Sequence, residues 1–515
     1  KNSLGFSYSD EKLDLNLQYG HMSTDGYREN NAFDRDGILL NGSIKLNERS
    51  KLSLLVNHID YTAQIPSSLG QTAFDEDPTQ AAFTWAASRG FEANKYTLAG
   101  VSYAYDISND LKNSTGIFYS YLDHYEPRPF NILDEFTNGY GFRSRFTGNF
   151  HTGLGNAEYS FGGEFYRDEY SWRTFENLYR DNNGNGSLEG AQISNNKEYR
   201  RQFNGFATLT LPVTLRLKAQ FGLNINKTHY DFRDLFIIGS GNRSASRNFK
   251  TIVLPSLSLE YLFGHGSRLY TNISRGYSNP SLEETLTPDG IINPDIAQET
   301  GINYELGTRL FFWPKAKLWI DITLYRMNIK NLLVAQRIGE DQFVGKNAGQ
   351  TRHQGVEFQL DSRINLSPQT SIAPSIGYTI SDHSFVDFVD GDDDFSGNPL
   401  TGVPKHRLHL STRLEHKKDF YWSTSYQFVD EIPLTDANSL SSKSYGIFNS
   451  RLGYSKQIIQ DLSIGFNAGV NNIFDSRYAQ SVLINAVGFG GNEPRYFYPG
   501  NDRNFYGGLV LKYDL

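Results

Sequence analysis

The stretch LRLKAQFGLNIN, residues 215–226, alternates apolar and polar side chains along its whole length. Its odd positions are Leu, Leu, Ala, Phe, Leu and Ile, and its even positions are Arg, Lys, Gln, Gly, Asn and Asn. Because successive side chains on a β-strand point to opposite faces, this stretch predicts a strand with one apolar face and one polar face. Residues 407–414 and 462–471 repeat the pattern, so the sequence predicts an all-β protein.

Two features of the pattern favour a membrane-spanning barrel over a soluble sandwich or propeller. The predicted strands are about 9–15 residues long, which suits a tilted strand that crosses a bilayer, whereas soluble strands have roughly 5–6 residues. The connections alternate between tight turns and long polar loops, as they do in outer-membrane barrels. The predicted long loops are residues 21–36, 62–94, 124–140, 169–197, 231–246, 278–300, 335–350, 381–403, 430–443 and 474–501.

The number of connections sets the size of the barrel. Roughly ten tight turns and ten long loops separate about 21 strands, and the first connection, at Asp10-Glu11, is a tight one. A bacterial barrel has an even number of strands, so we expect a transmembrane antiparallel barrel of about 22 strands, the size of plugged outer-membrane transporters. We therefore expect residues 1–515 to be one barrel domain that lacks its first strand.

The composition narrows the class of protein. The chain has 515 residues, no cysteine, 32 Tyr and 36 Phe, with a formal net charge of -8. The missing cysteines exclude disulfides and thiolate metal sites, and the negative charge argues against a nucleic-acid surface. No run of about 18 apolar residues predicts a transmembrane helix. Neither a G-x-S-x-G elbow nor an H-E-x-x-H motif occurs, so we expect no enzyme.

Several segments resemble the TonB-dependent receptor family of outer-membrane transporters. They occur in the family's order and are residues 274–277 with 279–283, 293–295, 299, 304–307, 347–349 with 355–357, 469–478, and 499–500 with 503–509. Most of these residues are interpreted as structural parts of the barrel rather than as ligand contacts, since lumen faces are polar by default. The final strand resembles the C-terminal assembly signal of outer-membrane proteins, although it ends on Leu515 where the family usually has an aromatic residue.

The resemblance implies partners that the residues alone do not reveal. Family members span the bacterial outer membrane and contact its lipid and lipopolysaccharide. They carry an N-terminal plug inside the barrel and a short segment that engages TonB-ExbB-ExbD, which supplies the energy. Neither the plug nor that segment is recognised in this sequence, so we expect both to be absent from this chain.

The cargo prediction comes from the loop at 62–94. The segment from Ile65 to Trp85 is similar to receptors of the ferric-citrate type, as is the entry from Asp25 to Asn30. This resemblance implies import of a ferric siderophore or a ferric citrate-like chelate. Arginine binds such anions through charge-assisted hydrogen bonds. Exposed arginines are also common without a ligand. Aromatic residues also form girdles at the membrane interface. The candidate ligand-binding residues are Arg28, Arg128, Arg143, Arg145, Arg173, Arg243, Arg275, Tyr125 and Trp172.

A calcium site is predicted in the segment DNNGNGSLE at 181–189. Its ligands would be Asp181, Asn183, Asn185, the Ser187 carbonyl and Glu189, at the spacing of an EF-hand-like loop. Gln192 stands where such a loop needs a bidentate Glu, and a flexible Asn/Gly turn is the alternative reading. No other cofactor is expected.

Other functions stay open at this point. Cobalamin is an alternative cargo, and the alternative function is that of a receptor-like barrel acting as a scaffold in a larger outer-membrane complex. A passive porin fits the family resemblance and the strand count less well. Haem import is disfavoured because no His lies in 278–300, while His229 and His383 are interpreted as isolated surface residues.

Overall fold

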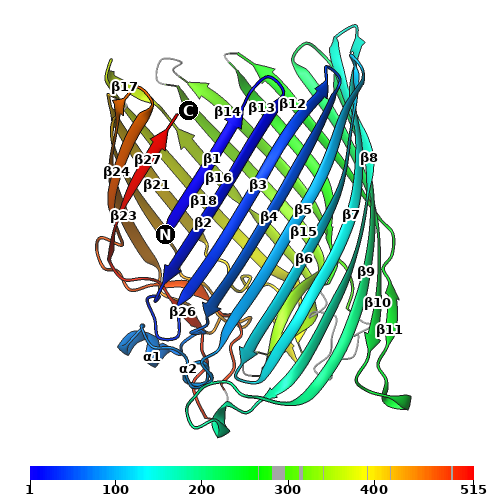
Figure 1. Cartoon of the computed structure of the whole chain (residues 1–515). Helices are drawn as coiled ribbons and strands as arrows, with labels where there is room; N and C mark the ends of the chain where they lie inside the picture. Colours follow the sequence, from blue (N-terminus) through cyan, green and yellow to red (C-terminus); the bar gives the residue numbers. More distant parts are fainter. Residues whose placement is uncertain are drawn as a thin grey trace.

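The computed structural model describes residues 1–264, 266–280, 296–312, 317–339, 342–390, 392–417, 419–488 and 491–514. Within these ranges 23 strands form one continuous sheet, in which every pair of neighbours is antiparallel. Figure 1 shows this sheet curved into the wall of a barrel with steeply tilted strands. The fold is therefore all-β, as the alternation at 215–226 predicts.

The strands of the first half are long and follow one another around the wall. Their bounds are β1 Asn2–Ser9, β2 Leu13–Thr24, β3 Phe33–Asn47, β4 Ser50–Gln64, β5 Phe91–Ser108, β6 Leu111–Arg128, β7 Asn131–Thr152, β8 Gly155–Asn177, β9 Glu189–Pro212, β10 Leu217–Asp234, β11 Ala245–Asn248, β12 Ile252–Phe263 and β13 Ser267–Ser278. Two short helices, α1 Gln71–Glu76 and α2 Phe83–Ser88, lie between β4 and β5. Two single turns of 3-10 helix are Tyr179–Asp181 and Gly239–Gly241.

The second half continues in the same way. Its strands are β14 Glu299–Phe312, β15 Leu318–Gly339, β16 Gln342–Asp361, β17 Ile364–Ser367, β18 Thr370–Asp387, β19 Val389–Asp390, β20 Asp393–Asp394, β21 His406–His416, β22 Phe420–Val429, β23 Tyr445–Ile459, β24 Leu462–Asn471, β25 Ala479–Val482, β26 Phe497–Pro499 and β27 Asn504–Tyr513. The pairs β19–β20 and β25–β26 form separate two-stranded sheets within loops.

The wall has an apolar outer face and a polar inner face. Leu223 on β10 is 43% exposed, Leu306 on β14 is 49% exposed and Leu324 on β15 is 49% exposed, although all three lie in the middle of the sheet. Large apolar side chains stay this exposed in a folded barrel on the side that faces lipid. The intervening residues therefore point inward, among them Lys218, which lies opposite Glu260. No helix among the described residues has the length and apolar character needed to cross a membrane.

The two ends of the barrel differ, as the connection lengths predict. Short turns occupy one end, at the top of Figure 1, and longer loops with α1, α2 and β26 occupy the other. Three predicted loops are wrong, because most of their residues are strand. In the loop predicted at 124–140, β6 continues to Arg128 and β7 begins at Asn131, so most of these residues are strand. In the loop predicted at 169–197, β8 continues to Asn177 and β9 begins at Glu189. In the loop predicted at 335–350, β15 and β16 remain paired up to Gly339 and Gln342. At the long-loop end the strands continue beyond the regular alternation of apolar and polar residues, because water on either face removes the need for it.

Aromatic rings lie over glycines on the neighbouring strand at several points of the wall. Gly469 is directly opposite Tyr506, and a Cβ added to it would come within 2.3 Å of that ring. Gly307 opposite Tyr270 and Gly453 opposite Tyr421 repeat this arrangement. A ring that covers a glycine shields the backbone there and fixes the register of the two strands.

The first and last strands of the sheet each pair on one side among the described residues. β1 pairs with β2, and β27 pairs with β24. When the short β11 and β17 are set aside, 21 strands form the wall, in agreement with the predicted number. Because neighbours alternate in direction, β1 and β27 run the same way.

Candidate functional site

The loops at the long-loop end pack into one ordered structure around a small apolar core. Leu69 and Phe74 from the β4–β5 connection meet Leu434, Ala486 and Phe497 from two later loops. Leu69 and Phe497 form a β-bridge, and the rings of Phe74 and Phe497 stack at 5.0 Å. These connections, at 65–90, 430–444 and 472–503, therefore form a joined rim over one part of the barrel mouth.

Arg28 fastens this rim to the β2–β3 loop. Its guanidinium donates to the carbonyl oxygen of Ser67 at 2.7 Å and to that of Gln80 at 2.9 Å, and the residue is only 8% exposed. Burial lowers the pKa of Arg28 to about 10, so it stays charged at neutral pH. The structure gives this predicted ligand-binding residue a structural role, and contact with cargo remains a prediction for it.

The predicted calcium loop also joins the rim. Asn183, Gly184 and Gly186 all have positive φ, as a tight Asn/Gly turn requires. Ser187 donates through its hydroxyl to the carbonyl of Ser88 at 2.8 Å, and Asn182 donates to the carbonyl of Gly186 at 3.0 Å. These contacts describe the turn in its own right, and calcium binding by Asp181, Asn183, Asn185, Ser187 and Glu189 remains a prediction.

Deeper in the barrel than the rim, β8 and β9 carry a buried charged cluster on their inner face. Arg200 donates to both carboxylate oxygens of Asp168, at 2.9 and 2.5 Å, and its Nε lies 3.8 Å from Glu198. Asp168 is 3% exposed and Glu198 is fully buried. Two carboxylates thus share one guanidinium, and within the described residues neither oxygen of Glu198 has a hydrogen-bond partner.

An aromatic group adjoins this charged cluster. Trp172 packs with Leu133 and Phe232, and its ring stacks on Tyr170 at 4.8 Å. The Tyr170 hydroxyl in turn donates to Glu135. Trp172, a predicted ligand-binding residue, therefore lies in a packed part of the inner wall and is 7% exposed.

The predicted arginines divide between the two faces of the wall. Arg143 and Arg145 share the inner face of β7, because the even-numbered Tyr140 and Phe142 of the same strand are exposed on the outer face. Arg143 lies 3.8 Å from Glu164 and over the Phe206 ring at 5.4 Å, while Arg145 donates to Ser160 at 2.9 Å.

Arg128 is also on the inner face, at the tip of β6. Its guanidinium donates to Asn131 at 2.7 and 2.9 Å and lies 3.6 Å from Glu126. These contacts hold the β6–β7 turn, which lies at the long-loop end of the barrel.

The other predicted residues are not gathered into this site. Arg173 pairs with Asp134 on the outer face of β7 and β8, and Tyr125 lies opposite Asp134 on that same face. Arg243 belongs to the loop after β10, where its backbone N–H donates to Asp234 at 3.2 Å. Arg275, on β13, donates to the carbonyl of Val253 at 3.4 Å.

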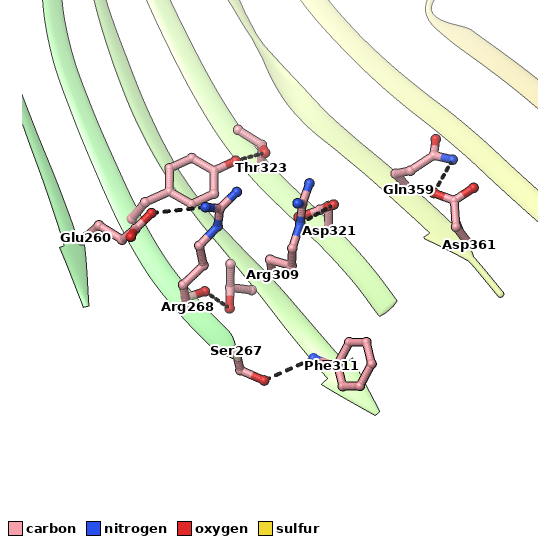
Figure 2. A network of polar contacts seen from close by, with 11 residues as sticks. Glu260, Ser267, Arg268, Arg309, Phe311, Asp321, Thr323, Gln359 and Asp361 are labelled. Atoms are coloured by element: carbon pink, nitrogen blue, oxygen red, sulfur yellow. Dashed lines mark hydrogen bonds and ion pairs between the residues drawn. The ribbon is translucent and has the colours of Figure 1, made fainter. Parts of the chain in front are cut away.

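A second polar network covers the inner wall close to the short turns. Figure 2 shows Arg268 reaching Glu260 from the next strand, and Arg309 reaching Asp321, at 3.1 and 2.8 Å. Gln359 donates to Asp361 at 3.0 Å one strand pair further on. The pairs alternate in sign from β12 to β16, so this part of the lumen is lined by charge without a large excess of either sign.

One histidine prediction is wrong. His383 is not isolated: its ring lies 4.6 Å from that of His353, and its Nε2 lies 3.0 Å from the hydroxyl of Tyr325. The two histidines are 30 positions apart in the chain, so only the pairing of β16 with β18 reveals their contact. Asp168 and Arg200 were missed for the same reason.

Together, the apolar outer face, the polar inner face and the asymmetric ends define a large membrane-type β-barrel. The model of the family "TonB dependent receptor-like, beta-barrel" matches residues 32–473. The chain therefore belongs to the TonB-dependent receptor family, whose members are transporters and receptors. The motifs at 281–283 and 293–295 that suggested this family lie outside the described residues.

Solved structures of iron receptors share the fold. The ferric citrate transporter FecA in its unliganded form has a TM-score of 0.80 at 17% identity, over 99% of this chain and 74% of that one. The siderophore receptor PiuA from Acinetobacter baumannii gives 0.76 at 14% identity, over 99% and 79%. The ferric yersiniabactin uptake receptor FyuA from Yersinia pestis gives 0.75 at 14% identity, over 100% and 77%.

Proposed function

We propose that this chain is the barrel of an outer-membrane importer that takes up a ferric siderophore or a ferric citrate-like chelate. Family membership supports a TonB-dependent receptor, and the iron carriers among the similar structures support the cargo class. The observation that carries the proposal is the two-faced wall, in which exposed Leu223, Leu306 and Leu324 face outward and Arg143 and Arg145 face the lumen. Such a wall suits a bilayer outside and an anionic solute inside.

The proposal includes the parts that complete such a receptor. A further strand, antiparallel to both β1 and β27, closes a barrel of about 22 strands, since two strands that run the same way do not complete an antiparallel barrel by themselves. A plug domain outside this chain fills the lumen. TonB-ExbB-ExbD acts through an N-terminal segment, also outside this chain, and lipopolysaccharide surrounds the outer wall.

In this proposal, arginines of the inner wall bind the cargo. Arg143 combines a guanidinium with the face of Phe206, and its side chain is 55% exposed toward the lumen. Arg145 lies two residues further along the same face, and its guanidinium donates to the neutral hydroxyl of Ser160 at 2.9 Å. Charge-assisted, bidentate hydrogen bonds from such arginines are the contacts that carboxylate-rich iron chelates favour.

The test is calorimetric binding of ferric citrate to the intact receptor in detergent, with cobalamin and haem as comparison ligands. We expect saturable ferric-citrate binding that Arg143→Gln with Arg145→Gln weakens about tenfold or more, because charge-assisted bonds are lost. Arg173→Gln is the matched control, since Arg173 lies on the outer face and should leave binding unchanged. Saturable binding of cobalamin alone would make cobalamin the cargo in place of a ferric chelate. Binding of none of the three ligands would favour a scaffold role.

A further inference from the structure

His353 and His383 face each other across two neighbouring strands of the inner wall. The pairing of β16 with β18 places them directly opposite one another. Leu324, exposed on the outer face, lies opposite Val356, so residues 353, 355 and 357 of β16 point the other way, into the lumen. The two imidazoles are therefore side by side on the polar face of the barrel.

The two rings meet at close range without lying parallel. Their centroids are 4.6 Å apart and their planes are tilted by 47°. His353 Nε2 lies 3.0 Å from the hydroxyl of Thr351, and His383 Nε2 lies 3.0 Å from the hydroxyl of Tyr325. Each ring is thus held in place through its Nε2 by a neutral hydroxyl.

The remaining nitrogen of His383 is unused. Within the part of the chain that the structure describes, His383 Nδ1 is buried and has no hydrogen-bond partner. A buried ring nitrogen without a partner is unusual, because desolvation is then uncompensated. An imidazole held through one nitrogen while the other stays open is how a histidine is prepared to ligate a metal.

Gly355 makes room for the third member of the group. A Cβ at Gly355 would come within 2.6 Å of the Tyr325 hydroxyl and 2.1 Å of the Ile380 carbonyl oxygen. Because the glycine has no side chain, the Tyr325 ring lies over the strand and its hydroxyl reaches His383. The three side chains come from β15, β16 and β18, so the surrounding sheet fixes their spacing.

We propose that His353 and His383 form a transition-metal site on the lumen wall, with Tyr325 beside it. Two imidazoles select Cu²⁺, Ni²⁺ or Zn²⁺ over Ca²⁺ and Mg²⁺, which prefer oxygen ligands, and the affinity order places Cu²⁺ first. Water completes the coordination of the ion. This site is separate from Arg143 and Arg145 on β7, and it stands whether or not the cargo is a ferric chelate.

The test is Cu²⁺ binding to the intact receptor, purified in detergent without a polyhistidine tag. Calorimetry should give one strong site per chain, and electron paramagnetic resonance should show hyperfine coupling to two imidazole nitrogens. His353→Phe and His383→Phe should each lower the affinity about tenfold or more. These variants keep an aromatic ring at each position, so they preserve the ring contact while removing the nitrogen ligands.

Two controls separate this site from folding and from the cargo. His409→Ala removes another histidine of the lumen wall, on β21, and should leave Cu²⁺ binding unchanged. Ferric-citrate binding by the phenylalanine variants should match that of the unmodified receptor. Equal Cu²⁺ affinity in the unmodified receptor and the double phenylalanine variant would overturn the proposal and leave the pair as a packing contact.

Discussion

Arg28 donates a hydrogen bond of 2.7 Å to the carbonyl oxygen of Ser67, which joins the β2–β3 loop to the longer β4–β5 connection. The same guanidinium reaches the carbonyl of Gln80 through a second nitrogen. One side chain thus holds both ends of the segment that carries α1, and the planar fork of arginine suits this task in a way that a single ammonium does not.

Arg28→Ala should release that segment. The carbonyls of Ser67 and Gln80 lose the hydrogen bonds from the Arg28 guanidinium, and a hydrogen bond to a charged group contributes about 1.5–3 kcal/mol. We expect faster hydrogen–deuterium exchange across residues 65–82, measured by mass spectrometry on the receptor in detergent. Arg28→Lys restores charge with one donor head and should give an intermediate rate. Unchanged exchange in the alanine variant would show that the apolar core around Leu69 and Phe497 holds the segment by itself.

The facing of β10 predicts unequal effects along one strand. Leu223→Arg places a charge toward lipid near the middle of the wall and should cost about 2–4 kcal/mol. Leu217 has the same facing but begins β10 next to a short turn, so Leu217→Arg should cost about 0–1 kcal/mol, as substitutions near the interface do. Folding into vesicles followed by denaturant titration measures both. Asn224→Leu, on the inner face, is the control and should change little.

The alternation along β10 shows which features of the fold could be predicted from the sequence alone. Residues 215–226 predicted an apolar face from the amino acids themselves, and the exposure of Leu223 bears this out. The same rule predicted 21 strands, because each crossing of a bilayer imposes the same period and each turn interrupts it. Where strands leave the bilayer, as β6 and β7 do near Arg128, the period is lost and the sequence suggested a loop.

The site was harder to predict, for a physical reason. Arg143 and Arg145 were predicted as lumen or loop arginines, and the structure places both on the inner face of β7, while their contact with cargo remains a prediction. His353 with His383, and Asp168 with Arg200, meet only through the register of neighbouring strands, about 30 residues apart, and one sequence carries no signal of that register. The packing of Leu69 on Phe497 joins opposite ends of the chain and had no local signal either.

Gly469 predicts a sharp dependence of stability on a single methyl group. Its added Cβ would meet the Tyr506 ring at 2.3 Å, so Gly469→Ala must push the ring away from the strand. We expect a loss of about 1–3 kcal/mol, the usual cost of overpacking. The temperature at which the barrel loses its compact mobility on a denaturing gel measures this loss. Gly507→Ala, on the paired strand, is the matched control, because its Cβ would meet only an oxygen at 3.6 Å.

The shared guanidinium of Arg200 predicts opposite results for its two carboxylates. Asp168 accepts two hydrogen bonds from Arg200, so Asp168→Asn breaks a buried pair and should cost about 3–5 kcal/mol. Glu198 is fully buried, its nearer contact with Arg200 is 3.8 Å, and its oxygens accept no hydrogen bond among the described residues. Removing a buried charge that lacks such bonds relieves desolvation, so Glu198→Gln should be neutral or stabilising.

Denaturant unfolding of both variants in the same detergent compares the two directly, and the double variant completes a thermodynamic cycle. If Glu198 partly replaces Asp168 as the partner of Arg200, the double variant will lose more stability than the two single changes added together. If Glu198→Gln alone costs as much as Asp168→Asn, then Glu198 carries an interaction with Arg200 of equal strength. The 3.8 Å separation would then understate the contact in the folded receptor.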